Sequence, residues 1–227
     1  MLAVSSLAHA DACLSSYGHR LQGKTESRCE MLAFDGLKRT YRTYLPAHLA
    51  EPAPVVLMLH GGGGSGSAQE LLSKGGFNRI ADREGIVVLY PDSVGRKHAI
   101  DRHRVFVTGM SNGGFMSFRL ARDAADVFRA AAPVVAGLSV DLGPKCKPAR
   151  PVSISIMNGT DDPLVPWQGG AVNCDAGTEV RLYEIRGGGH NWPRGAKYLG
   201  ESMVGRITQE FNGDEEIWSF FKSVSKQ

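Results

Sequence analysis

The chain has 227 residues, enough for one domain with a sizeable hydrophobic core. Its 26 Lys and Arg residues and 23 Asp and Glu residues give a formal charge of +3, and the cations are scattered along the sequence, which argues against binding to nucleic acid. Many of the 28 glycines gather at residues 61–64, 109–114 and 187–189, so they mark positions in a fold and not a low-complexity segment.

Residues 1–10 resemble the end of a secretory signal peptide. Ala8-His9-Ala10 fits the small-x-small cleavage pattern, but a basic segment before it is missing. The stretch is too short to cross a membrane. A disordered N-terminal tail is the alternative interpretation. We expect an N-terminal extension over residues 11–35 and a single folded domain over residues 36–227.

Four cysteines suit an oxidising compartment: Cys13, Cys29, Cys146 and Cys174. They allow three complete disulfide pairings, and the sequence does not choose among them. Cys13 with Cys29 is the most local pair and is therefore favoured. Four buried free thiols are the alternative.

The hydrophobic pattern predicts strands that alternate with helices. Residues 36–46 alternate bulky and polar side chains and end in a proline, which is typical of a half-exposed edge strand. Continuous apolar runs, as expected for strands buried on both faces of a parallel sheet, occupy residues 54–60, 86–91, 104–108, 130–135 and 152–157. Residues 180–185 alternate again. Helical patterns cover residues 68–83, 114–125 and 215–224. This order predicts an α/β fold with a mostly parallel central sheet and helices on both faces.

A nucleophile is predicted at the turn between the strand 104–108 and the next helix. Residues 109–113 read Gly-Met-Ser-Asn-Gly, which is the G-x-S-x-G elbow. A strand that reverses sharply into a helix holds its central residue at positive φ, and a Cβ on a neighbouring residue would collide with the turn. Ser111 is therefore the candidate nucleophile. An ordinary glycine-rich turn is the alternative.

A serine hydroxyl needs a histidine to take its proton and a carboxylate to orient that histidine. His190 is the best placed, because it follows three glycines just beyond the strand 180–185. The carboxylate is expected in the loop after the strand 152–157, where Asp162 is favoured over Asp161. The resulting order, Ser111 then Asp162 then His190, is characteristic of α/β-hydrolases.

The other six histidines have other expected places. His60 adjoins the first glycine cluster and is expected to support it. For the remaining five, solvated positions are expected; they are His9, His19, His48, His98 and His103.

Acyl transfer needs preset N–H donors for the developing oxyanion. The amide of Asn112, directly after the nucleophile, is one candidate. The glycine run after His60 supplies the other, with Gly62 preferred and Gly63 second. No Lys-Ser or Lys-Thr pair follows that run, so a phosphate-binding loop is not favoured. No H-E-x-x-H or C-x-x-C motif is present in the sequence, so no metal is expected.

Five segments together resemble the secreted polyhydroxybutyrate depolymerase and feruloyl esterase-like branch of the α/β-hydrolases. They are Leu-His-Gly-Gly-Gly-Gly at residues 59–64, the stretch 81–92 ending in Tyr-Pro-Asp, Thr-Gly-Met-Ser-Asn-Gly-Gly at 108–114, Gly-Thr-Asp-Asp-Pro-Leu-Val-Pro at 159–166 and Gly-Gly-His-Asn-Trp-Pro at 188–193. The resemblance runs from about residue 36 to residue 221.

The resemblance implies a serine carboxylic-ester hydrolase that needs no cofactor and has Ser111, Asp162 and His190 as its triad. Its implied substrates are hydroxyalkanoate polyesters, hydroxycinnamoyl esters on plant polysaccharide, or small acyl esters. Trp167 and Trp192 could line an aromatic subsite, and plain packing is equally compatible with either. A decayed hydrolase that only binds polysaccharide or polyester is the alternative of another class, and a serine peptidase is a further one.

Two connections are shorter than the resemblance implies. Residues 93–103 and 167–179 stand where relatives carry longer, helical stretches. A parallel crossover generally needs a dozen or more residues and a helix to cover the sheet. We therefore expect that the natural enzyme has additional residues near Lys97-His98 and Gly170-Ala171.

Overall fold

The computed structural model describes residues 26–34, 36–92, 100–138, 147–167 and 178–225. The predictions for residues 1–10, for Lys97-His98 and for Gly170-Ala171 lie outside these described residues. Cys29 is disulfide-bonded. The pairing prediction also names Cys13, Cys146 and Cys174, which lie outside the described residues.

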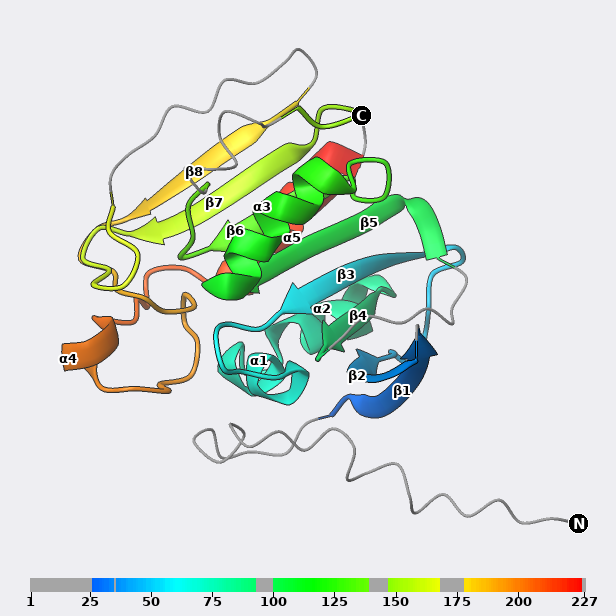
Figure 1. Cartoon of the computed structure of the whole chain (residues 1–227), viewed down its shortest axis with the longest axis horizontal. Helices are drawn as coiled ribbons and strands as arrows, with labels where there is room; N and C mark the ends of the chain where they lie inside the picture. Colours follow the sequence, from blue (N-terminus) through cyan, green and yellow to red (C-terminus); the bar gives the residue numbers. More distant parts are fainter. Residues whose placement is uncertain (1–25, 35, 93–99, 139–146, 168–177, 226–227) are drawn as a thin grey trace, which may run out of the picture.

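One sheet of eight strands organises the molecule, in the order β1-β2-β4-β3-β5-β6-β7-β8 (Figure 1). The strands are β1 (Arg28–Phe34), β2 (Leu37–Tyr44), β3 (Ala53–Leu59), β4 (Val87–Pro91), β5 (Ile100–Met110), β6 (Ala130–Val134), β7 (Ser153–Gly159) and β8 (Val180–Ile185). β1 pairs with β2, and β2 with β4, in antiparallel fashion, while all later pairs are parallel. The predicted α/β class with a mostly parallel sheet is confirmed.

Two details of the prediction are wrong. The segment expected as an edge strand is β2, which is flanked by β1 and β4, because residues 28–34 add a strand that lies before the expected domain start at residue 36. The single helix expected over residues 68–83 is two helices, α1 (Gly66–Leu72) and α2 (Gly76–Glu84). Lys74 and Gly75 lie between them at φ values of 53° and 62°, which a continuous helix does not accommodate.

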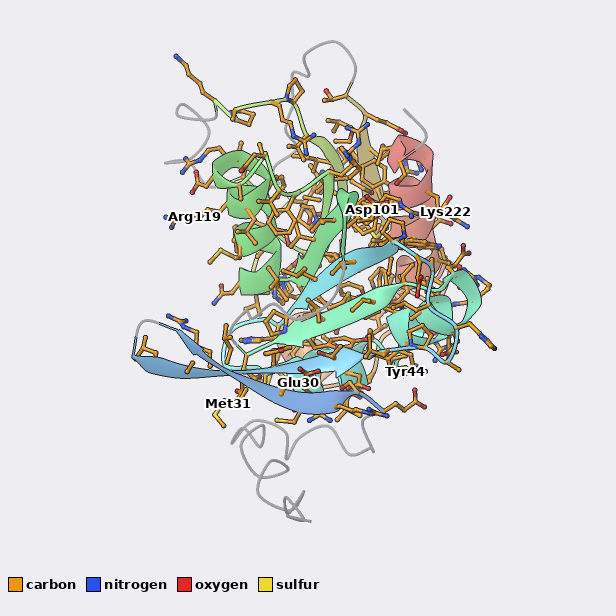
Figure 2. The ribbon with its side chains drawn as sticks, turned by 90° about the vertical axis from the view of Figure 1, so that its right-hand side faces the viewer. Glu30, Met31, Tyr44, Asp101, Arg119 and Lys222 are labelled. Atoms are coloured by element: carbon orange, nitrogen blue, oxygen red, sulfur yellow. The ribbon has the colours of Figure 1, made fainter. Side chains whose placement is uncertain are left out.

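Helices cover both faces of the sheet. α3 (Asn112–Asp123) packs on β5 and β6 from one side, and α5 (Gly213–Ser225) packs on β5, β6 and β7 from the other. Figure 2 shows these two helices on opposite sides of the strands, with Arg119 of α3 and Lys222 of α5 pointing outward. The short α4 (Glu201–Val204) lies in the loop before α5.

Strand alternation divides the core between the two faces. Successive side chains of a strand point to opposite faces. Val56 and Met58 of β3 accordingly join the core beneath α2 and α5, while Val55 and Leu57 join the core beneath α3. The neighbouring strands β4 and β5 divide their side chains in the same way, so the apolar runs seen in the sequence serve both layers.

One apolar side chain on the α3 face of the sheet is exposed. β4 ends at Pro91 and β5 begins at Ile100, so the link that must cross β3 is brief. On β8, Leu182 is paired with Ile156, whose side chain packs beside α3, and Leu182 is 48% exposed. Such exposure is expected where a helix that covers this face in relatives is missing. The expected additional residues stay a prediction.

The N-terminal strand is fastened to α1 through Glu70, which is 2% exposed. Its carboxylate accepts hydrogen bonds from the backbone N–H of Glu26 at 2.8 Å and of Ser27 at 3.1 Å, and from the Ser27 hydroxyl. Asn78 of α2 donates to it at 2.9 Å, and Arg42 of β2 lies 3.7 Å away. Buried charge is tolerated here because its acceptor capacity is filled.

A second buried carboxylate, Asp214, lies in the first turn of α5. It is 3% exposed and so close to α2 that a Cβ added to Gly76 would lie 2.1 Å from its Oδ2 atom. Burial raises its pKa from the ordinary value of 3.8 to about 7, and the positive charge of Arg79 only partly opposes this shift. The folded protein therefore retains a proton on Asp214 that the unfolded chain releases.

This retained proton predicts a pH-dependent stability. The stabilising contribution is complete below about pH 4 and is lost as the pH rises through about 7. Asp214→Asn removes the ionisation, so its melting temperature should exceed that of the wild type at pH 8 and should converge with it at pH 4. Differential scanning calorimetry across this range measures the difference.

Glu215→Gln is the matched control, because the hydrogen bond from Arg83 lowers the pKa of Glu215 and the variant should lose stability relative to wild type above pH 4. Parallel pH profiles for Asp214→Asn and the wild type would contradict the assignment.

Candidate active site

Ser111 occupies the strained corner between β5 and α3. Its backbone lies at φ 55° and ψ −118°, a conformation that a non-glycine residue rarely adopts. Its N–H donates to the Val134 carbonyl at 3.0 Å, and its carbonyl accepts from Phe115 N–H at 2.9 Å. The corner is thus held from β6 and from the first turn of α3, as the G-x-S-x-G motif predicted.

The elbow glycines are required by close packing. A Cβ on Gly109 would lie 2.6 Å from the Leu59 carbonyl oxygen, and one on Gly113 would lie 2.4 Å from the same atom. Either contact is far shorter than van der Waals separation. β3 can therefore approach the elbow only because these positions lack side chains.

His190 and Asp162 form a buried pair. His190 Nδ1 lies 2.8 Å from Asp162 Oδ2, and the two residues are 2% and 5% exposed. The second oxygen, Oδ1, accepts hydrogen bonds from the backbone N–H groups of Leu164 and Val165, each at 2.8 Å. These two donors orient the carboxylate, and the carboxylate in turn fixes the imidazole with Nδ1 toward it.

The neighbouring Asp161 is placed differently. It is exposed, and its carboxylate accepts a hydrogen bond from the hydroxyl of Thr160 at 2.9 Å, in the turn after β7. Of the two adjacent aspartates, the one that contacts the histidine is Asp162.

The loops that carry the acid and the base touch through glycine. A Cβ on Gly159, at the end of β7, would lie 2.0 Å from the Gly188 carbonyl oxygen, and one on Gly189 would lie 2.2 Å from the Val204 carbonyl oxygen. The N–H of His190 donates to the same Val204 carbonyl at 2.5 Å. Backbone packed on backbone therefore sets the position of His190 relative to the end of β7.

The glycine loop after β3 lies against the elbow. A Cβ on Gly62 would lie 3.0 Å from Asn112 Nδ2, and Gly63 adopts φ 67°. The backbone N–H groups of Gly62, Gly63 and Asn112 donate to no acceptor among the described residues. His60 Nδ1 lies 2.8 Å from the carbonyl of Gly61, in keeping with its expected supporting position.

A pocket of about 260 Å³ joins these parts. Ser111, His190 and Gly62 line it together with His60, and its apolar wall is formed by Ala68, Leu72, Met110, Leu164 and Leu199. Gly61, Gly64, Gln69 and Tyr198 complete the lining. Tyr198 donates its hydroxyl to the His190 carbonyl at 2.8 Å, and burial, reinforced by the charge of Asp162, raises its pKa to about 12.

The structure distinguishes the two tryptophans. Trp192 is 1% exposed and belongs to the core beneath α5, so packing accounts for its position and it is not among the residues that line the pocket. Trp167 is half-buried at the end of a described segment, and its role stays a prediction.

The sequence did not indicate three residues of the pocket, Gln69, Tyr198 and Leu199, because no motif marks them. Only the helical placement of Gln69 among apolar neighbours could have drawn attention to it.

Within the described segments, no group of three or more His, Cys, Asp or Glu side chains is arranged to hold a metal ion. Nor is any helix in them both long and apolar enough to cross a membrane. The site holds a serine hydroxyl, a histidine, a carboxylate and backbone amides.

The glycine contact between the acid and base loops yields a prediction. Gly159→Ala should lower the free energy of unfolding by about 2 kcal/mol or more, because the new methyl group overlaps the Gly188 backbone. Urea denaturation measures this loss. Gly137→Ala is the matched control, since a Cβ there meets nothing within 4 Å and the stability should be nearly unchanged. Equal stability of the two variants would refute the packing argument.

Comparison with known proteins agrees with this architecture. Residues 45–142, which include the glycine loop and the elbow, match the prolyl oligopeptidase family. Feruloyl esterase B of Piromyces equi is 34% identical over 100 residues, covering 43% of this chain and 19% of that protein. Poly(3-hydroxyalkanoate) depolymerase C of Paucimonas lemoignei is 27% identical over 159 residues, covering 55% and 36%.

The chain spans less than half the length of the curated relatives that it matches. A solved arylesterase structure superposes with a TM-score of 0.56 at 14% identity, covering 90% of this chain and 86% of the arylesterase. The strand order, the elbow at the end of β5 and the superposition on the arylesterase show that the chain has the α/β-hydrolase fold.

Proposed function

We propose that the chain is a serine carboxylic-ester hydrolase in which Ser111 is the nucleophile, His190 the general base and Asp162 the residue that orients it. The observation that carries the proposal is the shared pocket. Ser111, at its strained φ of 55°, faces the same pocket as His190, whose Nδ1 lies 2.8 Å from Asp162. Named esterases among the sequence relatives support the reaction class.

In the proposed reaction the Nδ1–H of His190 donates to Asp162, which lies 2.8 Å away. The Nε2 atom then accepts the proton of Ser111. Ser111 Oγ then attacks the ester carbonyl. Asp162, with its Oδ1 already occupied by two backbone donors, stabilises the imidazolium without taking the proton itself.

The developing oxyanion is held by the N–H groups of Asn112 and Gly62, with Gly63 as the second choice in the glycine loop. His190 next gives its proton to the alkoxide leaving group, and the acyl group stays on Ser111. Water repeats the sequence, with His190 as base, to release the carboxylic acid. No cofactor takes part in the proposed reaction.

Hydroxyalkanoate and hydroxycinnamoyl esters are the proposed substrate classes. The depolymerase and feruloyl esterase relatives support them. The pocket volume, about 260 Å³, lies below the roughly 300–1,000 Å³ typical of small-molecule sites, which favours one small acyl unit at a time. A non-catalytic binding role is disfavoured because it would need neither a strained serine nor a buried acid–base pair. The match to the prolyl oligopeptidase family justifies testing a peptide substrate in parallel.

We also propose that the protein is secreted. The disulfide at Cys29 supports this, because such bonds persist mainly in oxidising compartments.

Ser111→Ala should lower kcat for p-nitrophenyl butyrate by at least about three orders of magnitude while leaving the fold intact, because the nucleophile is lost. Steady-state kinetics with circular dichroism test this. Labelling of the wild type, but not of the variant, by a fluorophosphonate probe reports an activated serine. An unlabelled wild-type protein would favour the binding role, and cleavage of a peptide p-nitroanilide but no ester would favour the peptidase.

The two aspartates give a separate prediction. Asp162→Asn should lower kcat by about 10⁴-fold, because the amide can hold the imidazole in the wrong tautomer. Asp161→Asn serves as the control and should retain most activity, because the carboxylate of Asp161 accepts its hydrogen bond from Thr160 and not from His190. Comparable losses in the two variants would count against the role of Asp162.

A further inference from the structure

Gln69 of α1 is a buried amide with no partner. It is 1% exposed, and neither its Oε1 nor its Nε2 atom forms a hydrogen bond to any described residue. Its backbone is fully engaged in the helix, since its N–H donates to Ser65 and its carbonyl accepts from Ser73. The side chain therefore adds nothing to the hydrogen bonding of α1.

Leaving a buried amide unsatisfied costs stability, and an apolar side chain of similar shape would avoid that cost. The neighbouring Glu70 shows the contrast, because four donors from three residues fill its carboxylate oxygens. A structural role explains Glu70 but not Gln69. The unsatisfied amide points to a partner that is not part of the chain.

The pocket is where that partner would bind. Gln69 lines the same cavity as Ser111 and His190. Leu164, which is 58% exposed, marks the solvent side of this cavity, whereas Gln69 lies on its buried side. His60, His190 and Tyr198 of the same lining each have a hydrogen-bond partner, whereas the amide of Gln69 has none among the described residues.

Resting on the proposed esterase function, we propose that Gln69 determines specificity by hydrogen-bonding a hydroxyl group on the acyl part of the ester. A hydroxyl can donate to Oε1 or accept from Nε2, and both atoms are unpaired. A plain alkyl acyl group leaves the amide unsatisfied. Sites built to bind a substrate hydroxyl discriminate strongly against analogues that lack it.

The test compares kcat/KM for two ester pairs that differ by one hydroxyl: methyl 3-hydroxybutyrate with methyl butyrate, and methyl 4-hydroxycinnamate with methyl cinnamate. The wild type should prefer the hydroxylated member of at least one pair by roughly tenfold or more. Gln69→Met, which keeps the length and shape of the side chain without its polar atoms, should abolish this preference by slowing the hydroxylated ester alone. The pair that responds identifies an aliphatic or a phenolic hydroxyl.

Gln209→Met is the matched control, because Gln209 is exposed and does not line the pocket. Its selectivity should equal that of the wild type. The melting temperature of Gln69→Met should hold or rise, which keeps a folding defect apart from a loss of recognition. An unchanged selectivity ratio in Gln69→Met, or an equal loss on both members of each pair, overturns the role of Gln69. A wild type that hydrolyses none of the four esters refutes the underlying esterase proposal instead.

Discussion

Close approach of bare backbone is the constraint on which the site depends. Gly113 lets β3 lie against the elbow, and Gly159 lets the end of β7 lie against the loop that carries His190. Side chains at these positions would push the segments apart by more than a hydrogen bond tolerates. The imidazole and the carboxylate are buried and well paired because the main chain beneath them is already in contact. The glycines at the ends of the strands therefore set the geometry of the candidate site, and its polar side chains take their positions from that backbone.

The sequence predicted what depends on local chemistry. The elbow was found because its glycines are adjacent to Ser111 in the chain, and the sheet because its buried strands are continuously apolar. The choice between Asp161 and Asp162 needed the structure, since a one-residue step in a turn sends the two side chains in different directions. β1 was missed because it mixes charged and apolar residues, such as Glu30 and Met31, and is stabilised by its pairing with β2.

The break between α1 and α2 shows a different limit. Gly75 and Gly76 were visible as a signal, but the apolar periodicity continues across them and predicted one helix. Because of the break, α1 and α2 run in different directions. Gln69 of α1 lines the pocket, while α2 packs beneath α5. The role of Gln69 depends on burial without a partner, which only the packed structure reveals.

Glu70 ties the segment before β1 to one wall of the pocket. Gln69 and Glu70 are adjacent residues of α1. The backbone N–H groups of Glu26 and Ser27 donate to the carboxylate of Glu70 and so hold this helix in place. These two residues lie immediately before β1 and its disulfide-bonded Cys29. Loss of residues 26–27 would take three hydrogen bonds from the Glu70 carboxylate and would loosen the wall of the pocket that α1 forms.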